Sequence, residues 1–247
     1  MTRMPRYLGF QLGDYLLQRA SLPLILVLFV GGLPLYALLH NDRSLLAGPQ
    51  GPAMVRQLFT STVALFLPLG AFLAASGIVS TDRHRGHVRF YFARPVNVVG
   101  FYVQTYVVHG VCFTLLFGLI TWVFGLLALP QSIAGAMGAA ALTFVLIGGL
   151  GLLLSTLTRF DGALLVLLYL VSFTMQQIAA IPGRPQLPAW AMFLARILPP
   201  AHPLDQLRDH LFAGSPLDMA QLWHVLAYGA AAFILGLVAL RRLPLAR

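Results

Sequence analysis

Histidines and aspartates, which are common metal ligands and proton carriers, gather at two places in this sequence. The first group is Asp82, His84 and His87, and the second is His202, Asp205 and Asp209. A metal centre needs three or four ligands and a shell of residues that orients them. The first group offers one carboxylate beside arginines that repel a cation, whereas helix capping and solvation explain the second. We therefore expect no metal site.

Catalysis is not expected either, because the sequence contains no lysine and no glutamate. A Walker A loop and a Schiff base both need a lysine, and the HExxH motif of metalloproteases needs a glutamate. The sole cysteine, Cys112, permits neither an internal disulfide nor a cysteine-ligated metal cluster. Ser76 and His109 are a poor match to an intramembrane serine protease. We predict that the chain is not an enzyme and holds no cofactor of its own.

The elements that position these residues are strongly apolar. Of the 247 residues, 59% are hydrophobic and 9% are charged, whereas soluble domains have about 25% charged residues. This composition predicts an all-α, polytopic membrane protein with a single domain. Arginines in cytoplasmic loops explain the net charge of +9, so nucleic acid is not an expected partner.

Six apolar segments are long enough to cross a bilayer, which takes about 17–20 residues. The predicted spans are 21–39, 59–79, 98–129, 133–157, 163–181 and 222–240. Residues 6–20 have apolar and polar residues at helical spacing and predict a helix in the membrane interface, with an extension of the first span as the alternative. Residues 182–221 predict short amphipathic helices on the outer side.

The distribution of arginines predicts the topology. If both termini are cytoplasmic, the outer segments hold Arg43, Arg56, Arg184, Arg196 and Arg208, and the other eleven of the sixteen arginines are cytoplasmic. A five-span arrangement would place one terminus outside and spoil this distribution. We therefore predict six spans with both termini inside.

The loop between the second and third predicted spans, residues 80–97, holds four of the sixteen arginines. If it is helical, Tyr91 and Phe92 lie on one side, and Arg85 and Arg89 lie on another. The pattern predicts a short amphipathic helix along the cytoplasmic surface. It fits two interpretations equally: docking of a cytoplasmic partner, and attraction of anionic lipid headgroups.

Some polar and small residues lie inside the predicted spans. Ser172 and Gln176 share a face of the fifth span at four-residue spacing. Because polar groups inside a membrane are costly and often functional, they favour the lining of a translocation path, with hydrogen bonding between helices as the alternative. The glycine-rich run 148–151, together with Gly70 and Ala74, indicates close helix packing.

Taken in order, these elements resemble the permease subunit of an ABC transporter of the type-two exporter class. The resemblance covers nearly the whole chain: an interfacial helix, six spans and a basic loop after the second span with an Arg-Pro pair. Further similarities are LLSTLTRFDGALL at 153–165, the LPP and amphipathic stretch at 198–212 and ALRRLPL at 239–245.

The resemblance implies that the loop after the second span is a coupling helix, which docks into a groove of a separate ATPase subunit. The implied contact residues are Asp82, Arg83, Arg85, Gly86, Arg89, Arg94 and Pro95. The family usually has a glutamate near the start of this loop, and Asp82 stands there in this chain. ATP and Mg²⁺ would belong to the ATPase, because this chain has no P-loop.

The resemblance further implies two permease copies and two ATPases in the cytoplasmic (inner) membrane of a prokaryote. A substrate would be exported along a path between the copies, with Tyr36, Ser172 and Gln176 as candidate lining residues. The second copy is either identical or a related chain, and lipid, glycan, drug and peptide all remain possible substrates. A membrane anchor or scaffold whose basic loop binds lipid or a partner, without transport, is the alternative class.

Overall fold

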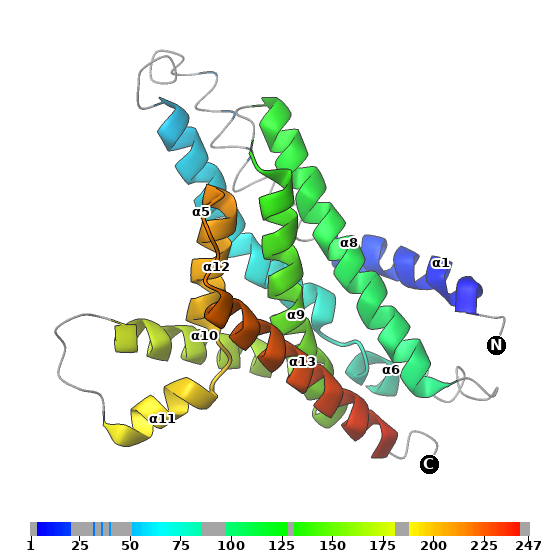
Figure 1. Cartoon of the computed structure of the whole chain (residues 1–247). Helices are drawn as coiled ribbons and strands as arrows, with labels where there is room; N and C mark the ends of the chain where they lie inside the picture. Colours follow the sequence, from blue (N-terminus) through cyan, green and yellow to red (C-terminus); the bar gives the residue numbers. More distant parts are fainter. Residues whose placement is uncertain are drawn as a thin grey trace.

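The structure, a computed structural model, describes residues 4–20, 51–84, 97–127, 131–180 and 188–242, together with Gly32, Tyr36 and His40. Within these ranges the chain is helical and has no strand. The helices are α1 (Met4–Asp14), η1 (Tyr15–Arg19), α5 (Gly51–Ala75), α6 (Ser80–His84), α8 (Val98–Leu127), α9 (Ile133–Leu157), α10 (Asp161–Ala180), α11 (Ala189–Ile197), α12 (Ala201–Ala213) and α13 (Met219–Arg242) (Figure 1).

Five of the helices are long and apolar enough to cross a membrane: α5, α8, α9, α10 and α13. At 1.5 Å per residue, α9 with its 25 residues extends about 37 Å, which exceeds the roughly 30 Å of a hydrocarbon core. The chain is therefore a multi-pass, all-α membrane protein in its described part. These helices match five of the six predicted spans, and the first, 21–39, lies outside the described residues.

The observed boundaries differ from the predicted ones mainly at α5, which begins at Gly51 instead of residue 59. Pro52 explains this early start, since proline is favoured in the first helical turn, where its missing N–H is not needed. At the other end of the chain, α13 begins at Met219 and continues to Arg242, beyond the predicted 222–240.

The central helix of the bundle is α9, which packs against α5, α8, α10, α12 and α13 (Figure 1). Small residues permit this position. A Cβ atom on Gly229 of α13 would lie 2.5 Å from the Val145 carbonyl oxygen, and one on Gly151 would lie 2.7 Å from the Ala75 side chain. The glycine-rich run of α9 therefore serves close helix packing, as the sequence predicts.

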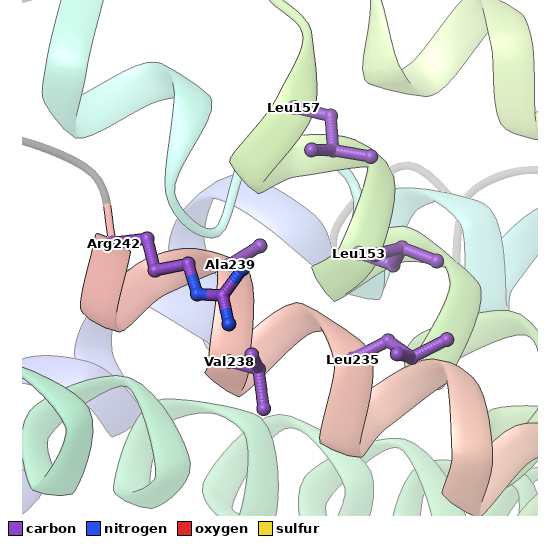
Figure 2. A pocket seen from close by; sticks show the side chains of 6 residues that line it. All are labelled: Leu153, Leu157, Leu235, Val238, Ala239 and Arg242. Atoms are coloured by element: carbon purple, nitrogen blue, oxygen red, sulfur yellow. The ribbon is translucent and has the colours of Figure 1, made fainter.

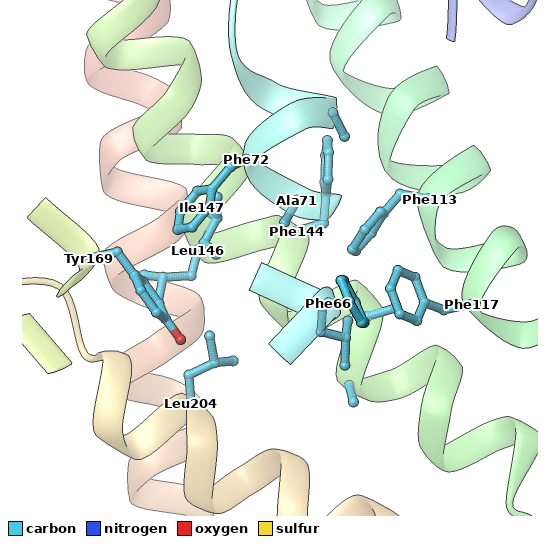
Figure 3. Packing of buried hydrophobic residues seen from close by; sticks show 14 of the residues in the cluster. Phe66, Ala71, Phe72, Phe113, Phe117, Phe144, Leu146, Ile147, Tyr169 and Leu204 are labelled. Carbon is cyan, nitrogen blue, oxygen red and sulfur yellow. The ribbon is translucent and has the colours of Figure 1, made fainter. Parts of the chain in front are cut away.

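Aromatic rings fill the space between the first three long helices. Figure 3 shows Phe66 of α5 near Phe113 and Phe117 of α8, while Phe72 of α5 lies beside Tyr169 of α10. The Phe113 ring is also 5.9 Å from that of Phe144 of α9, between centroids. The rings of Phe113 and Phe117 have centroids 4.9 Å apart in a tilted arrangement, which is favourable for aromatic pairs. Because lipid is as apolar as these side chains, van der Waals packing, more than the hydrophobic effect, holds this core together.

Two helices, α10 and α11, extend away from the rest of the bundle (Figure 1). On α10, Leu167 and Leu170 are 57% and 55% exposed, and on α11 Trp190 and Phe193 are both 63% exposed. Helices α11 and α12 occur where the sequence predicts short outer helices. The amphipathic Trp190 near the start of α11 is typical of residues at a membrane interface.

Candidate functional site

The N-terminal helix lies against α8 through its polar residues. The Gln11 amide donates to the Thr105 hydroxyl at 2.7 Å, and the Tyr15 ring lies 5.4 Å from the His109 ring, between centroids. Leu8, Leu12 and Leu16 are exposed. Gln11 and Tyr15 therefore face α8, and the leucines face outward as in a helix lying on lipid.

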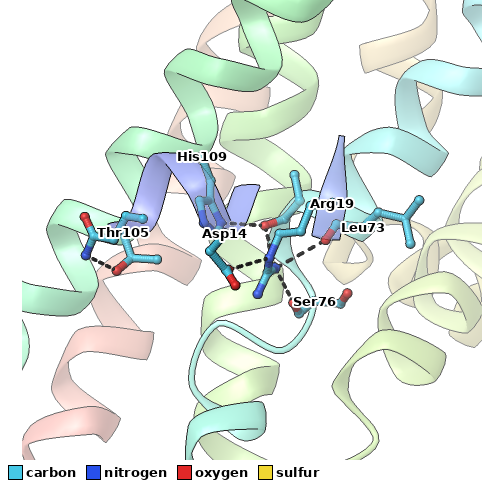
Figure 4. A network of polar contacts seen from close by, with 8 residues as sticks. Asp14, Arg19, Leu73, Ser76, Thr105 and His109 are labelled. Carbon is cyan, nitrogen blue, oxygen red and sulfur yellow. Dashed lines mark hydrogen bonds and ion pairs between the residues drawn. The ribbon is translucent and has the colours of Figure 1, made fainter. Parts of the chain in front are cut away.

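Arg19 joins the end of this N-terminal segment to the end of α5. Its guanidinium donates to the carbonyl oxygens of Leu73, Ala74 and Ser76 at 3.3, 3.0 and 2.5 Å (Figure 4). The last carbonyls of a helix lack partners within the helix and form the negative end of its dipole, so a cation is favourable there. Arg19 thus supplies the C-terminal cap of α5.

The environment of Arg19 is both buried and acidic. Burial lowers the pKa of the guanidinium, and the carboxylate of Asp14, 3.6 Å away, acts against this shift, as do the more distant Asp82 and Asp161. A guanidinium remains protonated in proteins despite such shifts. His109 adds a further bond, since its Nδ1–H donates to the Ala74 carbonyl oxygen at 2.9 Å (Figure 4).

The turn that follows α5 is held from its other side by α9 and α10. Gly77 has φ of +73°, a conformation that favours glycine, and its N–H donates to Asp161 Oδ2 at 2.6 Å. The Ser80 hydroxyl donates to Asp161 Oδ1 at 3.0 Å. Ser155 Oγ accepts from the N–H groups of Val79 and Ser80, both at 2.9 Å. One aspartate and one serine therefore fix the backbone of this turn.

The first residues of the predicted coupling segment are anchored in the same way. Arg83 donates to the Thr156 carbonyl oxygen at 3.0 Å, and the Tyr102 hydroxyl of α8 donates to Asp82 Oδ2 at 3.3 Å. The structure thus attaches Asp82 and Arg83 to α8 and to the end of α9. The other predicted contact residues, Arg85, Gly86, Arg89, Arg94 and Pro95, lie outside the described residues.

The predicted path residues of α10 make bonds within the subunit. Ser172 is fully buried and donates to the Leu168 carbonyl oxygen of its own helix. The Gln176 amide donates to the carbonyl oxygens of Ala195 and Pro199 at 3.2 and 2.9 Å and accepts from the His202 N–H at 2.9 Å. Gln176 therefore fastens α10 to the link between α11 and α12.

The third candidate lining residue, Tyr36, is 59% exposed and stacks on His40 with ring centroids 4.2 Å apart. A shared lining role for Tyr36, Ser172 and Gln176 stays a prediction.

The second histidine and aspartate group, which is His202, Asp205 and Asp209, makes other bonds. Both His202 ring nitrogens contact glutamine amides, those of Gln177 and Gln206, at 3.1 Å each. Arg208 bonds to both Asp205 and Asp209. Within the described parts of the chain, no group of three or more His, Cys, Asp or Glu side chains is placed to hold a metal ion.

Three residues that bond to the end of α5 or to the turn after it were not predicted from the sequence to be important: Arg19, Ser155 and Asp161. For Asp161 a signal exists, since it is the sole acidic residue between Asp82 and Asp205 and precedes an apolar run. A single acid at the edge of a span needs a partner. Ser155 gives no such signal, because a serine in an apolar helix commonly bonds to its own backbone.

In its described part, the chain is a multi-pass helical membrane protein. The bonds of Arg19, Ser155 and Asp161 hold the turn after α5 at one end of the bundle, and we call these three residues and the turn the polar junction. Comparison with family models finds no match, and a search of curated proteins finds none either. The likeness to an ABC permease therefore stays a prediction from the sequence.

Proposed function

We propose that this chain is the membrane-spanning permease subunit of an ABC transporter of the type-two exporter class. It would pair with a second permease copy and with separate ATPase subunits, and it would export a substrate across the prokaryotic cytoplasmic membrane. One observation carries the proposal: the turn after α5 and the first residues of the predicted coupling loop are together bonded to four other parts of the molecule. A force on that loop would therefore reach the bundle.

Three of these connections start from the turn and one starts from α6. Arg19 connects the end of α5 to the N-terminal helix, Ser155 connects the turn to α9, and Asp161 connects it to α10. Tyr102 connects Asp82 of α6 to α8. Bonds to charged groups are the stronger ones, at about 1.5–3 kcal/mol each. Movement of α6 would thus displace α8, α9 and α10 together.

The source of energy in this proposal is a partner protein. Because the chain has no lysine, it cannot form a Walker A loop, and ATP and Mg²⁺ would be bound by the ATPase. The ATPase groove would receive the segment from Asp82 to Pro95. ATP-driven closure of the two ATPases would then shift the equilibrium between two arrangements of the permease pair.

The exposed side of α10 supports a second permease copy. Leu164, Leu167, Leu170 and Val171 are each 40% exposed or more. The helix has little of its surface covered within the subunit, although its two ends are held by Asp161 and Gln176. A second copy placed against α10 would cover this face, and the transport path would run between the copies.

The experiment that tests the proposal is co-purification in mild detergent from cells that express the chain with its neighbouring genes. Wild type is compared with Arg85→Glu/Arg89→Glu, and Arg56→Glu/Arg196→Glu is the matched control at two exposed arginines. We expect a Walker-motif ATPase to accompany wild type and the control and to be lost from the first variant.

Two other outcomes would count against this function. If no ATPase accompanies wild type, the chain is better explained as an anchor or scaffold subunit without transport. If an ATPase binds wild type and both variants equally, then an ATPase partner exists but docks elsewhere than on the predicted coupling loop.

A further inference from the structure

A groove with an apolar wall and a cationic end lies between α9 and α13. Its volume is about 430 Å³, and it is lined by Leu153, Leu157, Leu235, Val238, Ala239 and Arg242. Figure 2 shows the Arg242 side chain folded back along α13 beside Ala239, so that its guanidinium lies at the groove and not beyond the helix end. We refer to these six residues as the α9–α13 groove.

A second hollow, of about 340 Å³, lies beside the start of α6. It is lined by Ser80, Arg83, His84, Leu157, Thr158 and Arg159, which we call the arginine pocket. Leu157 lines both the groove and the pocket, so the two hollows adjoin. The leucine-lined groove, with Arg242 at its rim, therefore lies next to a pocket bordered by Arg83 and Arg159.

The three arginines of this region are not neutralised by carboxylates within the described ranges. No ion pair there involves Arg83, Arg159 or Arg242. Arg83 donates to a backbone carbonyl, and Arg159 lies over the Phe160 ring, 4.8 Å from its centroid. Such contacts hold a guanidinium in place and leave other N–H donors of the fork for an anion.

The acidic residues close in sequence to these arginines bond to other groups. Asp161 accepts hydrogen bonds from the Gly77 N–H and the Ser80 hydroxyl, and Asp82 accepts from the Tyr102 hydroxyl. The Thr158 hydroxyl accepts from the Phe160 N–H and keeps its own proton for an anion, whereas the Ser80 hydroxyl already donates to Asp161. The guanidiniums and Thr158 therefore supply the donors and the positive charge that a phosphate group requires.

We propose that the α9–α13 groove and the arginine pocket together bind one anionic phospholipid. Its phosphate lies at the cationic end, where Arg242 borders the groove and Arg83 and Arg159 border the pocket. An acyl chain follows Leu153 and Leu235 along the groove. This inference does not depend on transport, since it uses only residues at the end of the bundle.

The apolar part of the region favours a lipid over a free phosphate. A soluble anion would use the guanidiniums and leave the leucine-lined groove unused. Leu157 and Phe160, at the junction of α9 and α10, are 64% and 60% exposed, which places this region at the edge of the apolar surface. An amphiphile with one anionic end matches both halves of the site.

The charge requirement is tested with Arg159→Gln/Arg242→Gln. These two arginines are exposed, whereas Arg83 is left intact because it bonds to the Thr156 backbone. Arg56→Gln/Arg196→Gln removes the same charge from exposed positions on α5 and α11. Purified full-length proteins are titrated with phosphatidylglycerol or phosphatidylcholine, and bound lipid is counted by native mass spectrometry.

We expect wild type and the α5/α11 variant to retain phosphatidylglycerol in preference to phosphatidylcholine. The Arg159/Arg242 variant should lose affinity for phosphatidylglycerol by roughly tenfold or more, given the contribution of each arginine to anionic lipid binding. Equal retention by all three proteins, or an equal loss in both variants, would overturn the site.

The groove is tested separately with Ala239→Phe, which fills the apolar space and keeps all three guanidiniums. We expect phosphatidylglycerol binding to fall as far as in the arginine variant, and glycerol 3-phosphate at the same concentration not to displace the lipid from wild type. If Ala239→Phe binds the lipid normally and glycerol 3-phosphate competes well, the pocket is a site for small soluble anions, and the lipid proposal is wrong.

Discussion

The two ends of α10 are held by different chemistry. At its start lies Asp161, which is 5% exposed. Its carboxylate accepts hydrogen bonds from the Gly77 N–H and the Ser80 hydroxyl after α5. Near its end, the neutral amide of Gln176 binds two carbonyl groups and one N–H at the link between α11 and α12. Between these ends the helix has exposed apolar faces.

Under the proposed function, this difference would make the Asp161 end transmit force and the Gln176 end adapt. Bonds to a buried charge are strong and leave a costly unpaired group when broken, whereas a neutral amide exchanges partners at smaller cost. We therefore expect the Asp161 end to move with α5 and α6 as one unit. In the proposed transport cycle, the Gln176 end would rearrange at the smaller cost.

The largest effect is expected from Asp161→Ala. It removes the acceptor for the Gly77 N–H and the Ser80 hydroxyl in a buried position, which should lower the free energy of unfolding by about 3 kcal/mol. Thermal unfolding in detergent, followed by tryptophan fluorescence, measures the change as a fall in Tm. Asp218→Ala, at an exposed site, is the control and should cost about 1 kcal/mol, as for a lost helix cap. Equal effects of the two substitutions would contradict the account.

The next effect concerns the cap of α5. Arg19→Met should lower the free energy of unfolding by about 2 kcal/mol, because three carbonyl oxygens lose a charged donor and Asp14 loses its partner. Arg19→Lys keeps the charge without the planar fork and should fall between wild type and Arg19→Met. The same Tm measurement applies, with exposed Arg56→Met as the control. A lysine variant no better than the methionine variant would show that the charge itself contributes little.

A smaller loss of stability is expected from Gln176→Leu, about 1–2 kcal/mol, since the bonds it removes are neutral. This variant distinguishes a purely structural role of Gln176 from a role in the predicted path. If Gln176 also lines the path, transport should change more than Tm does, whereas Asp161→Asn should alter Tm and transport together. A Gln176→Leu protein with unchanged transport would limit the residue to its structural role.

The smallest effect is a pH dependence of stability that comes from Asp205 of α12. Burial raises the pKa of the Asp205 carboxyl, and the neighbouring Arg208 opposes this shift, with Asp209 adding to it. The folded state therefore binds this proton more tightly than the unfolded chain. Stability from this group rises as pH falls from the raised folded pKa to the ordinary value near 3.9, and it is constant below that. Asp205→Asn should remove this part of the Tm–pH profile. An unchanged profile would contradict the inferred burial.

Much of the helical architecture follows from the sequence, because apolar runs of span length carry a strong signal. Five of the six predicted spans coincide with long helices, and the short helices α11 and α12 lie where amphipathic patterns predict them. The start of α5 at Gly51 was not predicted, since a segment with glycine and proline resembles a loop and Pro52 marks a helix start only in context.

The polar junction was harder to predict, because its bonds join residues far apart in the sequence. Arg19 and Ser76 are 57 positions apart, and Gly77 and Asp161 are 84 apart. Periodicity describes one helix at a time and does not say which side chain of another helix reaches a given turn. The basic loop could be recognised from its composition, while Ser155 and Arg19 acquire a role only through packing.

Under the proposed function, the α5–α6 turn relays the work of a partner ATPase to the bundle. ATP hydrolysis by the assembled complex in proteoliposomes, with transport measured in the same vesicles, tests this role for wild type and Asp161→Asn. We predict that the complex containing the variant still assembles and hydrolyses ATP, and that transport per ATP falls severalfold. If transport per ATP is unchanged in a variant with a lowered Tm, the junction stabilises the fold without coupling it to the ATPase.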